Sequence, residues 1–205
     1  MTARWSFNRR RDKEKIIYEH ITWVGPFCLP GFENKDSQNK IPDISGVYLF
    51  CFPLAANFVL ESAGISKSTK KRIVTHLREY RKGNYNIFDM EAIKNSERVE
   101  IWHGWAEAKK EENKEEFIRN KEFYSNAIEK QLSNYRIFVT KIGDLRKRER
   151  IEAALMINAY TSKEPWADLA PRWMHLKGRY NDEMPIIIVN ECHATIFGLP
   201  ENIEI

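Results

Sequence analysis

The pattern of apolar and polar residues predicts short strands and amphipathic helices that begin in earnest after residue 42. Residues 46–52 (GVYLFCF) are β-branched and aromatic, and residues 57–63 follow after a short connection, which predicts a β-hairpin. Residues 136–142 (RIFVTKI) alternate like a third strand, and residues 185–190 (PIIIVN) predict a further buried strand.

Helical spacing follows two of these strands. The segment after the hairpin has two possible N-cap serines and a buried stripe at i, i+4 and i+7: Ser66 and Ser68, then Ile73, Leu77 and Tyr80. Residues 145–160 predict a second helix, in which Ile151 and Leu155 are buried and Glu152 lies at the edge of the stripe. Residues 107–131 predict a long, highly charged helix.

These elements predict an α/β domain of the α+β kind, with a small, mainly antiparallel, three-stranded sheet flanked by helices. Residues 1–42 are expected to form a basic N-terminal arm, including Arg9 to Arg11, and an irregular approach loop rich in proline and glycine from residue 25 on. The core is expected at residues 43–160, with a helical insertion at about 84–132. Residues 161–205 are expected to pack on it as a C-terminal extension.

The composition excludes several classes of protein. Of the 205 residues, 30% are charged and 42% are hydrophobic, which is the balance of a folded chain rather than of a disordered, collagenous or rod-like one. The 3 cysteines, Cys28, Cys51 and Cys192, are too widely spaced for a disulfide framework or a metal knuckle, so we expect buried small side chains.

The sequence indicates neither a membrane span nor a signal peptide. No apolar run approaches the roughly 20 residues that cross a bilayer, and residues 1–15 carry charges where a signal peptide needs an apolar core. We therefore expect a cytoplasmic protein without a membrane partner.

Positive charge concentrates in one short segment. Between Ser66 and Lys82 there are seven basic residues and one acidic residue, although the net charge of the chain is only +4. Such a block attracts a phosphate backbone, and it is equally the composition of a solvated helix face.

The hairpin and the two helices also carry a set of residues in a distinctive order. In chain order they are Gly46, Val47 and Tyr48 in the first strand, Gly64 at the end of the second, Arg72 and His76 in the first helix, and Glu152 in the later helix. Arg72 follows Gly64 by eight residues, and His76 follows Arg72 by four. In this order and spacing, residues 45–82 and 135–160 resemble the stand-alone, restriction-endonuclease-like branch of the GIY-YIG nuclease family.

The resemblance implies a DNA endonuclease that depends on Mg²⁺ or Mn²⁺, with a restriction-like or phage-defence role because no repair module or DNA-binding repeat is attached. Glu152 would be the single protein ligand of the metal, Arg72 would hold a phosphate oxygen, and His76 would position the attacking water or relay its proton. Tyr48 could serve as the base only if Arg72, His76 or a cation lowers its pKa from about 10.

One position departs from the family pattern. Ser62 stands two residues before Gly64, where the family has its second tyrosine, and a serine hydroxyl is too weak an acid to replace a phenol as proton carrier. The alternative function is therefore a catalytically impaired nucleic-acid-binding protein with the same fold.

Further residues are candidates for contact with the substrate: Gly64, Ser66, Lys67, Lys70, Lys71 and Arg78. Trp102 and Trp105 could stack on bases, although packing within the core or the insertion is the favoured interpretation. DNA is the expected partner, and RNA stays an alternative. A site with one metal makes one cut, so an enzyme that cuts both strands would have to form a homodimer or rebind.

Overall fold

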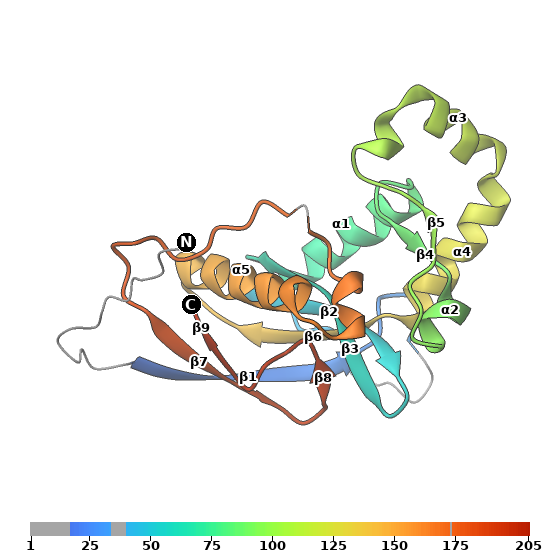
Figure 1. The fold of residues 1–205 in the computed structure, drawn as a ribbon. Coiled ribbons are helices and arrows are strands. Elements are labelled where there is room, and N and C mark those ends of the chain that lie inside the picture. The colour runs from blue at the N-terminus through green and yellow to red at the C-terminus, as the bar shows by residue number, and fades with distance from the viewer. Residues whose placement is uncertain (1–16, 34–39, 173) are drawn as a thin grey trace.

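The computed structural model describes residues 17–33, 40–172 and 174–205, and a curved mixed sheet lies at their centre (Figure 1). Seven strands follow the order β8-β3-β2-β6-β1-β7-β9. Strand β1 pairs with β6 in antiparallel and with β7 in parallel orientation. The strands are β1 (Ile17–Phe27), β2 (Gly46–Leu54), β3 (Asn57–Ser66), β6 (Arg136–Lys141), β7 (Ile186–Cys192), β8 (Ile196–Phe197) and β9 (Asn202–Glu204).

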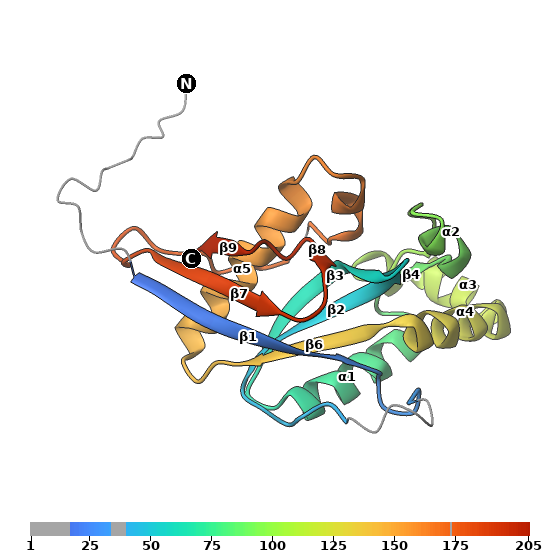
Figure 2. The same ribbon diagram turned by 90° about the horizontal axis from the view of Figure 1, so that it is seen from below.

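The prediction of a small three-stranded antiparallel sheet is wrong, although the α+β class stands. The three predicted strands lie side by side as β3, β2 and β6, but four further strands extend them on both sides (Figure 2). The interpretation of residues 25–42 as an irregular loop fails at its start, because Gly25 and Pro26 belong to β1. The register between β1 and β6 shifts there, and such an irregularity is where a strand tolerates proline.

All three predicted parts of the chain supply strands to this sheet. Strand β1 precedes residue 42, and β7, β8 and β9 follow the 3₁₀ helix η3 (Pro165–Leu169). Strand β7 confirms the strand predicted at 185–190, although Ile188 is the one residue in it that is buried. The basic residues of the predicted N-terminal arm, Arg9 to Arg11, lie outside the described residues.

Alternate side chains of β2 enter two cores on opposite faces of the sheet. Helix α1 (Thr69–Arg81) packs on one face with Tyr48, Phe50 and Phe52, and helix α5 (Leu145–Thr161) packs on the other with Val47, Leu49 and Cys51. Both predicted helices and their buried stripes are thereby confirmed. Burying each large aliphatic side chain contributes about 1.5–3 kcal/mol, so the two cores hold the helices in place.

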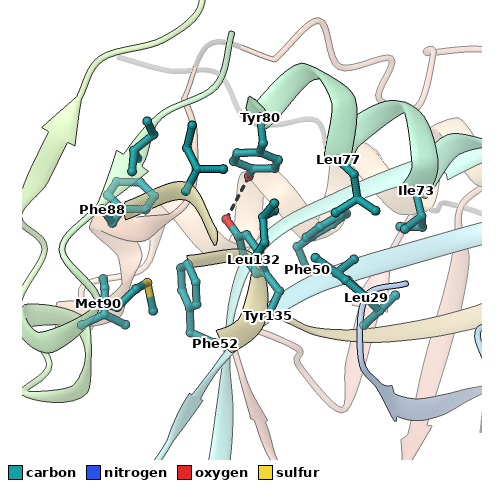
Figure 3. Close-up of a cluster of buried hydrophobic side chains, with 14 of the residues drawn as sticks. Leu29, Phe50, Phe52, Ile73, Leu77, Tyr80, Phe88, Met90, Leu132 and Tyr135 are labelled. Carbon is teal, nitrogen blue, oxygen red and sulfur yellow. Dashed lines mark hydrogen bonds between the residues drawn. The ribbon is translucent and has the colours of Figure 1, made fainter. Parts of the chain in front are cut away.

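Figure 3 shows the core beneath α1. Ile73, Leu77 and Tyr80 of the helix meet aromatic side chains of the sheet, and the hydroxyl groups of Tyr80 and Tyr135 are hydrogen-bonded at 2.9 Å. This face therefore buries several polar aromatic groups as well as hydrocarbon.

A serine and an aspartate set the first residues of the two helices. Ser68 is the N-cap of α1, accepts from the backbone N–H of Lys71 and donates to Asp43 at 2.6 Å. Asp144 caps α5 by accepting from the backbone N–H of Lys147 at 2.6 Å. These caps fix where the two helices begin.

The insertion is more divided than its charge pattern predicts. It contains β4 (Ile87–Phe88), α2 (Met90–Lys94), β5 (Glu100–Trp102), the 3₁₀ helix η2 (Glu107–Lys109), α3 (Glu111–Arg119) and α4 (Lys121–Asn134). The predicted single helix at 107–131 is wrong, because Asn120 leaves the helical conformation and separates α3 from α4. Helix α4 buries Tyr124, Ile128 and Leu132, whereas α3 has no buried residue and lies away from the sheet (Figure 1).

Candidate active site

Strand β2 and helix α1 bring three of the predicted site residues into contact. Tyr48 points from the centre of the sheet towards α1 and is 3% exposed. Its hydroxyl oxygen lies 2.8 Å from Nε2 of His76 and 3.2 Å from Nε of Arg72. Arg72 and His76 lie one helical turn apart, so both reach the same phenol.

Burial keeps this tyrosine–histidine pair uncharged. Burial and, to a smaller extent, the nearby positive charge of Arg72 together lower the pKa of His76 to about 3, so the imidazole is neutral at pH 7. Burial raises the pKa of Tyr48 to about 12, which outweighs the opposite effect of Arg72. Because Arg72 donates to the phenol oxygen, the phenol hydrogen is free to be donated to Nε2 of His76. The sequence predicted that Tyr48 could act as the base only if its pKa were lowered. The pKa is instead raised, so this condition is not met.

Gly64 makes room for the phenol. It pairs with Tyr48 across the β2–β3 ladder, and a Cβ atom at this position would overlap the Tyr48 hydroxyl oxygen. A glycine is therefore required by close approach rather than by its backbone angles.

Glu152 reaches the same place from the opposite face of the sheet. Strand β3 pairs with β8 only at Phe58 and Val59, so its far end lies at an edge that α5 can approach. Burial raises the pKa of Glu152 to about 7, while the positive charge of Arg72 opposes this shift. The carboxyl group and the guanidinium thus act on each other electrostatically around the edge of the sheet.

Neighbouring arginines do not neutralise Glu152. Arg148 donates to the side chain of Ser45 and the carbonyl oxygen of Ser66, and Arg150 donates to the carbonyl oxygens of Met184 and Ile205. Within the described part of the chain, no basic side chain forms an ion pair with Glu152. The carboxyl group of Glu152 is therefore not compensated by Arg148 or Arg150, although both are close to it in sequence.

These groups line one small cavity of about 120 Å³. Its walls include five of the predicted site residues: Tyr48, Gly64, Arg72, His76 and Glu152. A larger cavity of about 820 Å³ shares Arg98 and Leu169 with it, but contains none of the predicted site residues. We base the candidate site on the smaller cavity, because the chemically useful groups converge there.

Glu61 also lines the cavity, and sequence reasoning did not assign it to the site. The register between β2 and β3 shifts after Phe50, which pairs with Ser62, whereas Cys51 pairs with Leu60. The extra residue at this bulge is Glu61, which leaves the strict alternation and lies with Ser62 on the α1 side. The one sign in the sequence that Glu61 could belong to the site was its charge among the mainly apolar residues of a predicted strand.

The Glu61 carboxyl group is a second acid with an unusual pKa. Burial raises its pKa to about 7, while a hydrogen bond from the Ser62 hydroxyl at 2.5 Å and the charge of Arg98 lower it. Ser62, which replaces the expected second tyrosine, is therefore occupied by a neighbouring carboxyl group.

Apart from Gly64, the predicted substrate-binding residues lie outside the cavity, on α1 or just before it. Lys67, Lys70 and Lys71 are exposed at the beginning of the helix, and none has an ion-pair partner among the described residues. Arg78 is paired with Glu79 at 3.3 Å, and the Ser66 hydroxyl is bonded to Ser68. Among these residues the three lysines are thus the ones without an ion pair, although Lys70 and Lys71 lie near enough to Asp43 to act on it electrostatically.

The donor set suits a hydrated magnesium ion better than a metal held mainly by protein. Within residues 17–33, 40–172 and 174–205, no group of three or more histidine, cysteine, aspartate or glutamate side chains is placed to hold a metal. Mg²⁺ keeps several waters and commonly uses one or two carboxylates together with substrate phosphates. Glu152, without an ion pair and on the cavity wall, fits this requirement.

Comparison of the chain with protein-family models, with curated proteins and with solved structures finds no match. Among the described residues, no helix is both long and apolar enough to cross a membrane. The geometry of the cavity is therefore the basis for any functional assignment.

Proposed function

We propose that the protein is a Mg²⁺-dependent endonuclease that hydrolyses phosphodiester bonds in DNA. The observation that supports this proposal is the convergence of Tyr48, Arg72, His76 and Glu152 on one cavity from three elements, β2, α1 and α5. Together they supply a proton acceptor, a phosphate ligand and a carboxylate for a metal, which are the groups that this hydrolysis requires.

Arg72 is the group that would bind the scissile phosphate. Its Nε atom donates to the Tyr48 hydroxyl at 3.2 Å, and within residues 17–33, 40–172 and 174–205 its two terminal nitrogens have no hydrogen-bond partner, so they can bind a ligand. A planar guanidinium donates two parallel hydrogen bonds to phosphate oxygens, so the fork suits this task better than a lysine.

Tyr48 and His76 would remove a proton from the attacking water as a pair. The phenol oxygen takes a proton from water while the phenol hydrogen passes to Nε2 of His76, so Tyr48 never has to carry a full negative charge. The positive charge of Arg72 is one cause of the low His76 pKa. A phosphate bound to Arg72 would offset that charge and make the imidazole a better acceptor when substrate is present.

Glu152 would hold the metal through its carboxylate oxygens. The bound ion would supply Lewis-acid stabilisation of the phosphate and of the leaving oxygen. Glu152 belongs to α5 and His76 to α1, so the metal ligand and the proton acceptor would come from helices on opposite faces of the sheet.

Ser62 favours the alternative of a nucleic-acid-binding protein with impaired catalysis. Its hydroxyl is engaged by Glu61 at 2.5 Å, so this position has neither a phenol nor a free hydroxyl to assist proton transfer. The two functions differ in one observable, which is whether bound DNA is cut.

Incubation with supercoiled plasmid and Mg²⁺ or Mn²⁺ tests the proposal. We expect nicked or linear DNA, and we expect EDTA or the substitution Glu152→Gln to abolish its formation. Glu111→Gln is the matched control, because Glu111 is an exposed carboxylate on α3 outside the cavity. Salt-sensitive retention of plasmid without cutting by the wild type would support the alternative. Undiminished cutting by Glu152→Gln would overturn the role of Glu152.

A further inference from the structure

Trp105 differs from the other tryptophan of the WHGW segment. Trp102 is 6% exposed and packs in the α1-side core, as predicted, whereas Trp105 is 51% exposed. Trp105 is therefore not a core residue, although its ring packs on Tyr85 within the insertion. Its side chain lines the same cavity as Tyr48 and Arg72, so a large exposed aromatic ring lies at the mouth of the candidate active site.

The backbone holds this ring at the cavity in an uncommon conformation. Trp105 has a φ of 58°, in the left-handed region that bulky residues rarely adopt. Its N–H donates to the carbonyl oxygen of Asn84 at 2.9 Å, and the N–H of Gly104 donates to the Asn86 side chain at 2.9 Å. A Cβ atom at Gly104 would overlap the backbone of Tyr85. The surrounding chain therefore fixes the position of Trp105, as is common for strained residues at functional sites.

A row of rings connects Trp105 to the buried tyrosine–histidine pair. The Trp105 and Tyr85 ring centroids are 5.0 Å apart, and those of Tyr85 and His76 are 5.5 Å apart. Tyr85 is itself half-buried and lines the cavity. The wall between the surface and His76 is therefore a continuous aromatic surface.

We propose that Trp105 and Tyr85 bind an unpaired nucleobase next to the phosphate held by Arg72, so that the substrate is single-stranded or locally unpaired nucleic acid. This inference rests on the proposed function. In a polynucleotide, the flat apolar group next to a phosphate is a base, and aromatic side chains stack on bases of every kind. In a paired duplex the bases are stacked on one another, so their faces cannot reach the indole ring.

The polar neighbours of these rings indicate recognition of the base face rather than its edge. Asn86 accepts from Gly104 and donates to Glu100, and Arg98 is paired with Glu100 at 2.6 Å. With these polar groups already engaged, the site has little capacity to distinguish one base from another. We therefore expect tolerance of base identity together with preference for unpaired strands.

Fluorescence anisotropy in EDTA tests this inference without requiring cleavage. The probes are a fluorescein-labelled single-stranded DNA oligonucleotide, the same strand with an abasic site at each successive position, and its fully paired duplex. The proteins are the wild type, Trp105→Ala, Trp105→Phe and the control Phe123→Ala, which removes a 60% exposed ring on α4 outside the cavity. Thermal unfolding of each variant verifies that it is folded.

We expect Trp105→Ala to weaken single-strand binding about tenfold, and Trp105→Phe to restore most of the affinity. Duplex binding should change less than twofold in every variant. An abasic site at the contacted position should weaken binding by the wild type but not by Trp105→Ala, because both changes remove the same stacking contact.

Equal single-strand affinity of the wild type and Trp105→Ala would overturn this inference, as would equal losses for single strand and duplex. The plasmid assay separates this failure from failure of the proposed function. Cutting by a protein whose Trp105→Ala variant binds normally would leave the nuclease assignment intact and remove the base site. Loss of single-strand binding in Trp105→Ala without any cutting by the wild type would support the base site and overturn the nuclease assignment.

Discussion

The two faces of the sheet bury polar side chains in different ways. On the α5 face, Arg148 and Arg150 are almost fully buried, and the hydrogen bonds that they donate go mainly to backbone carbonyl oxygens. On the α1 face, Tyr48, His76 and Glu61 bond to other side chains around a cavity. Buried arginines that bind the backbone join segments of the fold, whereas titratable groups that face a cavity remain available to a ligand.

The largest effects should come from replacing one arginine by lysine on each face of the sheet. Arg72→Lys keeps a positive charge but loses the planar fork, so we expect single-turnover cleavage to fall at least about 100-fold. The free energy of unfolding should change by less than about 1 kcal/mol, since Arg72 is exposed at one end. The measurements are single-turnover cleavage of a labelled oligonucleotide and urea unfolding. Normal cleavage by Arg72→Lys would remove Arg72 from the site.

Arg148→Lys should show the reverse. Both hydrogen bonds of Arg148, to the Ser45 hydroxyl and the Ser66 carbonyl oxygen, come from one terminal nitrogen. A lysine side chain is one bond shorter and does not reach this position, so buried acceptors are left unsatisfied. We expect the free energy of unfolding to fall by about 2–4 kcal/mol in urea denaturation, while the cleavage rate of the folded protein changes little. A stable variant would show that the face of the sheet does not predict the role of a buried arginine.

The parts of the fold that the sequence could predict are those whose burial follows a local pattern. Strands β2, β3 and β6 and helices α1 and α5 were predictable, because local alternation and helical spacing record which side is buried. Strand β1 was not, because Gly25 and Pro26 are typical of loops, and β8 and β9 have only two and three residues. Pairing with distant strands stabilises these segments, and no local pattern records such pairing.

The candidate site likewise contains residues that the sequence could predict and residues that it could not. Tyr48, Arg72 and His76 could be predicted together, since a strand position and an i, i+4 pair on the next helix depend on local spacing. Glu61 could not, because a bulge shifts it out of alternation. Trp105 could not either, because its exposure depends on contacts with Asn84 and Tyr85 in a separate loop.

The buried carboxyl group of Glu61 should make the free energy of unfolding depend on pH. The folded pKa of about 7 lies above the usual 4.5, so the unfolded chain loses its proton first as the pH rises. The wild type therefore loses up to about 3 kcal/mol of stability between pH 4.5 and 7, and this loss persists at higher pH.

Glutamine does not ionise, so Glu61→Gln should be more stable than the wild type at pH 8 by about 1–3 kcal/mol and nearly equal at pH 4. Urea unfolding of both proteins across this range is the measurement. Taking the difference between them removes the opposite contribution of His76, whose lowered pKa destabilises the fold as the pH falls below 6.5. A constant difference across the range would show that Glu61 titrates normally.

The smallest effects on DNA binding are expected from the exposed lysines at the beginning of α1 and just before it. Neutralising Lys67, Lys70 or Lys71 to glutamine should weaken DNA binding similarly for all sequences, and each should lower the salt slope by about one. Lys114→Gln is the control, because Lys114 is paired with Glu111 on α3. A filter-binding salt titration measures the slope. Unchanged slopes would identify this part of α1 as a solvated face.

We propose that Tyr48 and His76 act as one catalytic unit on the α1 face. A double-mutant cycle of single-turnover cleavage with Tyr48→Phe, His76→Gln and the double variant tests it most directly. We predict that each single substitution slows cleavage at least about 100-fold and that the double variant is no slower than the slower single variant. Losses that multiply in the double variant would show that the two residues act independently, and a single variant that cleaves at the wild-type rate would remove its residue from the site.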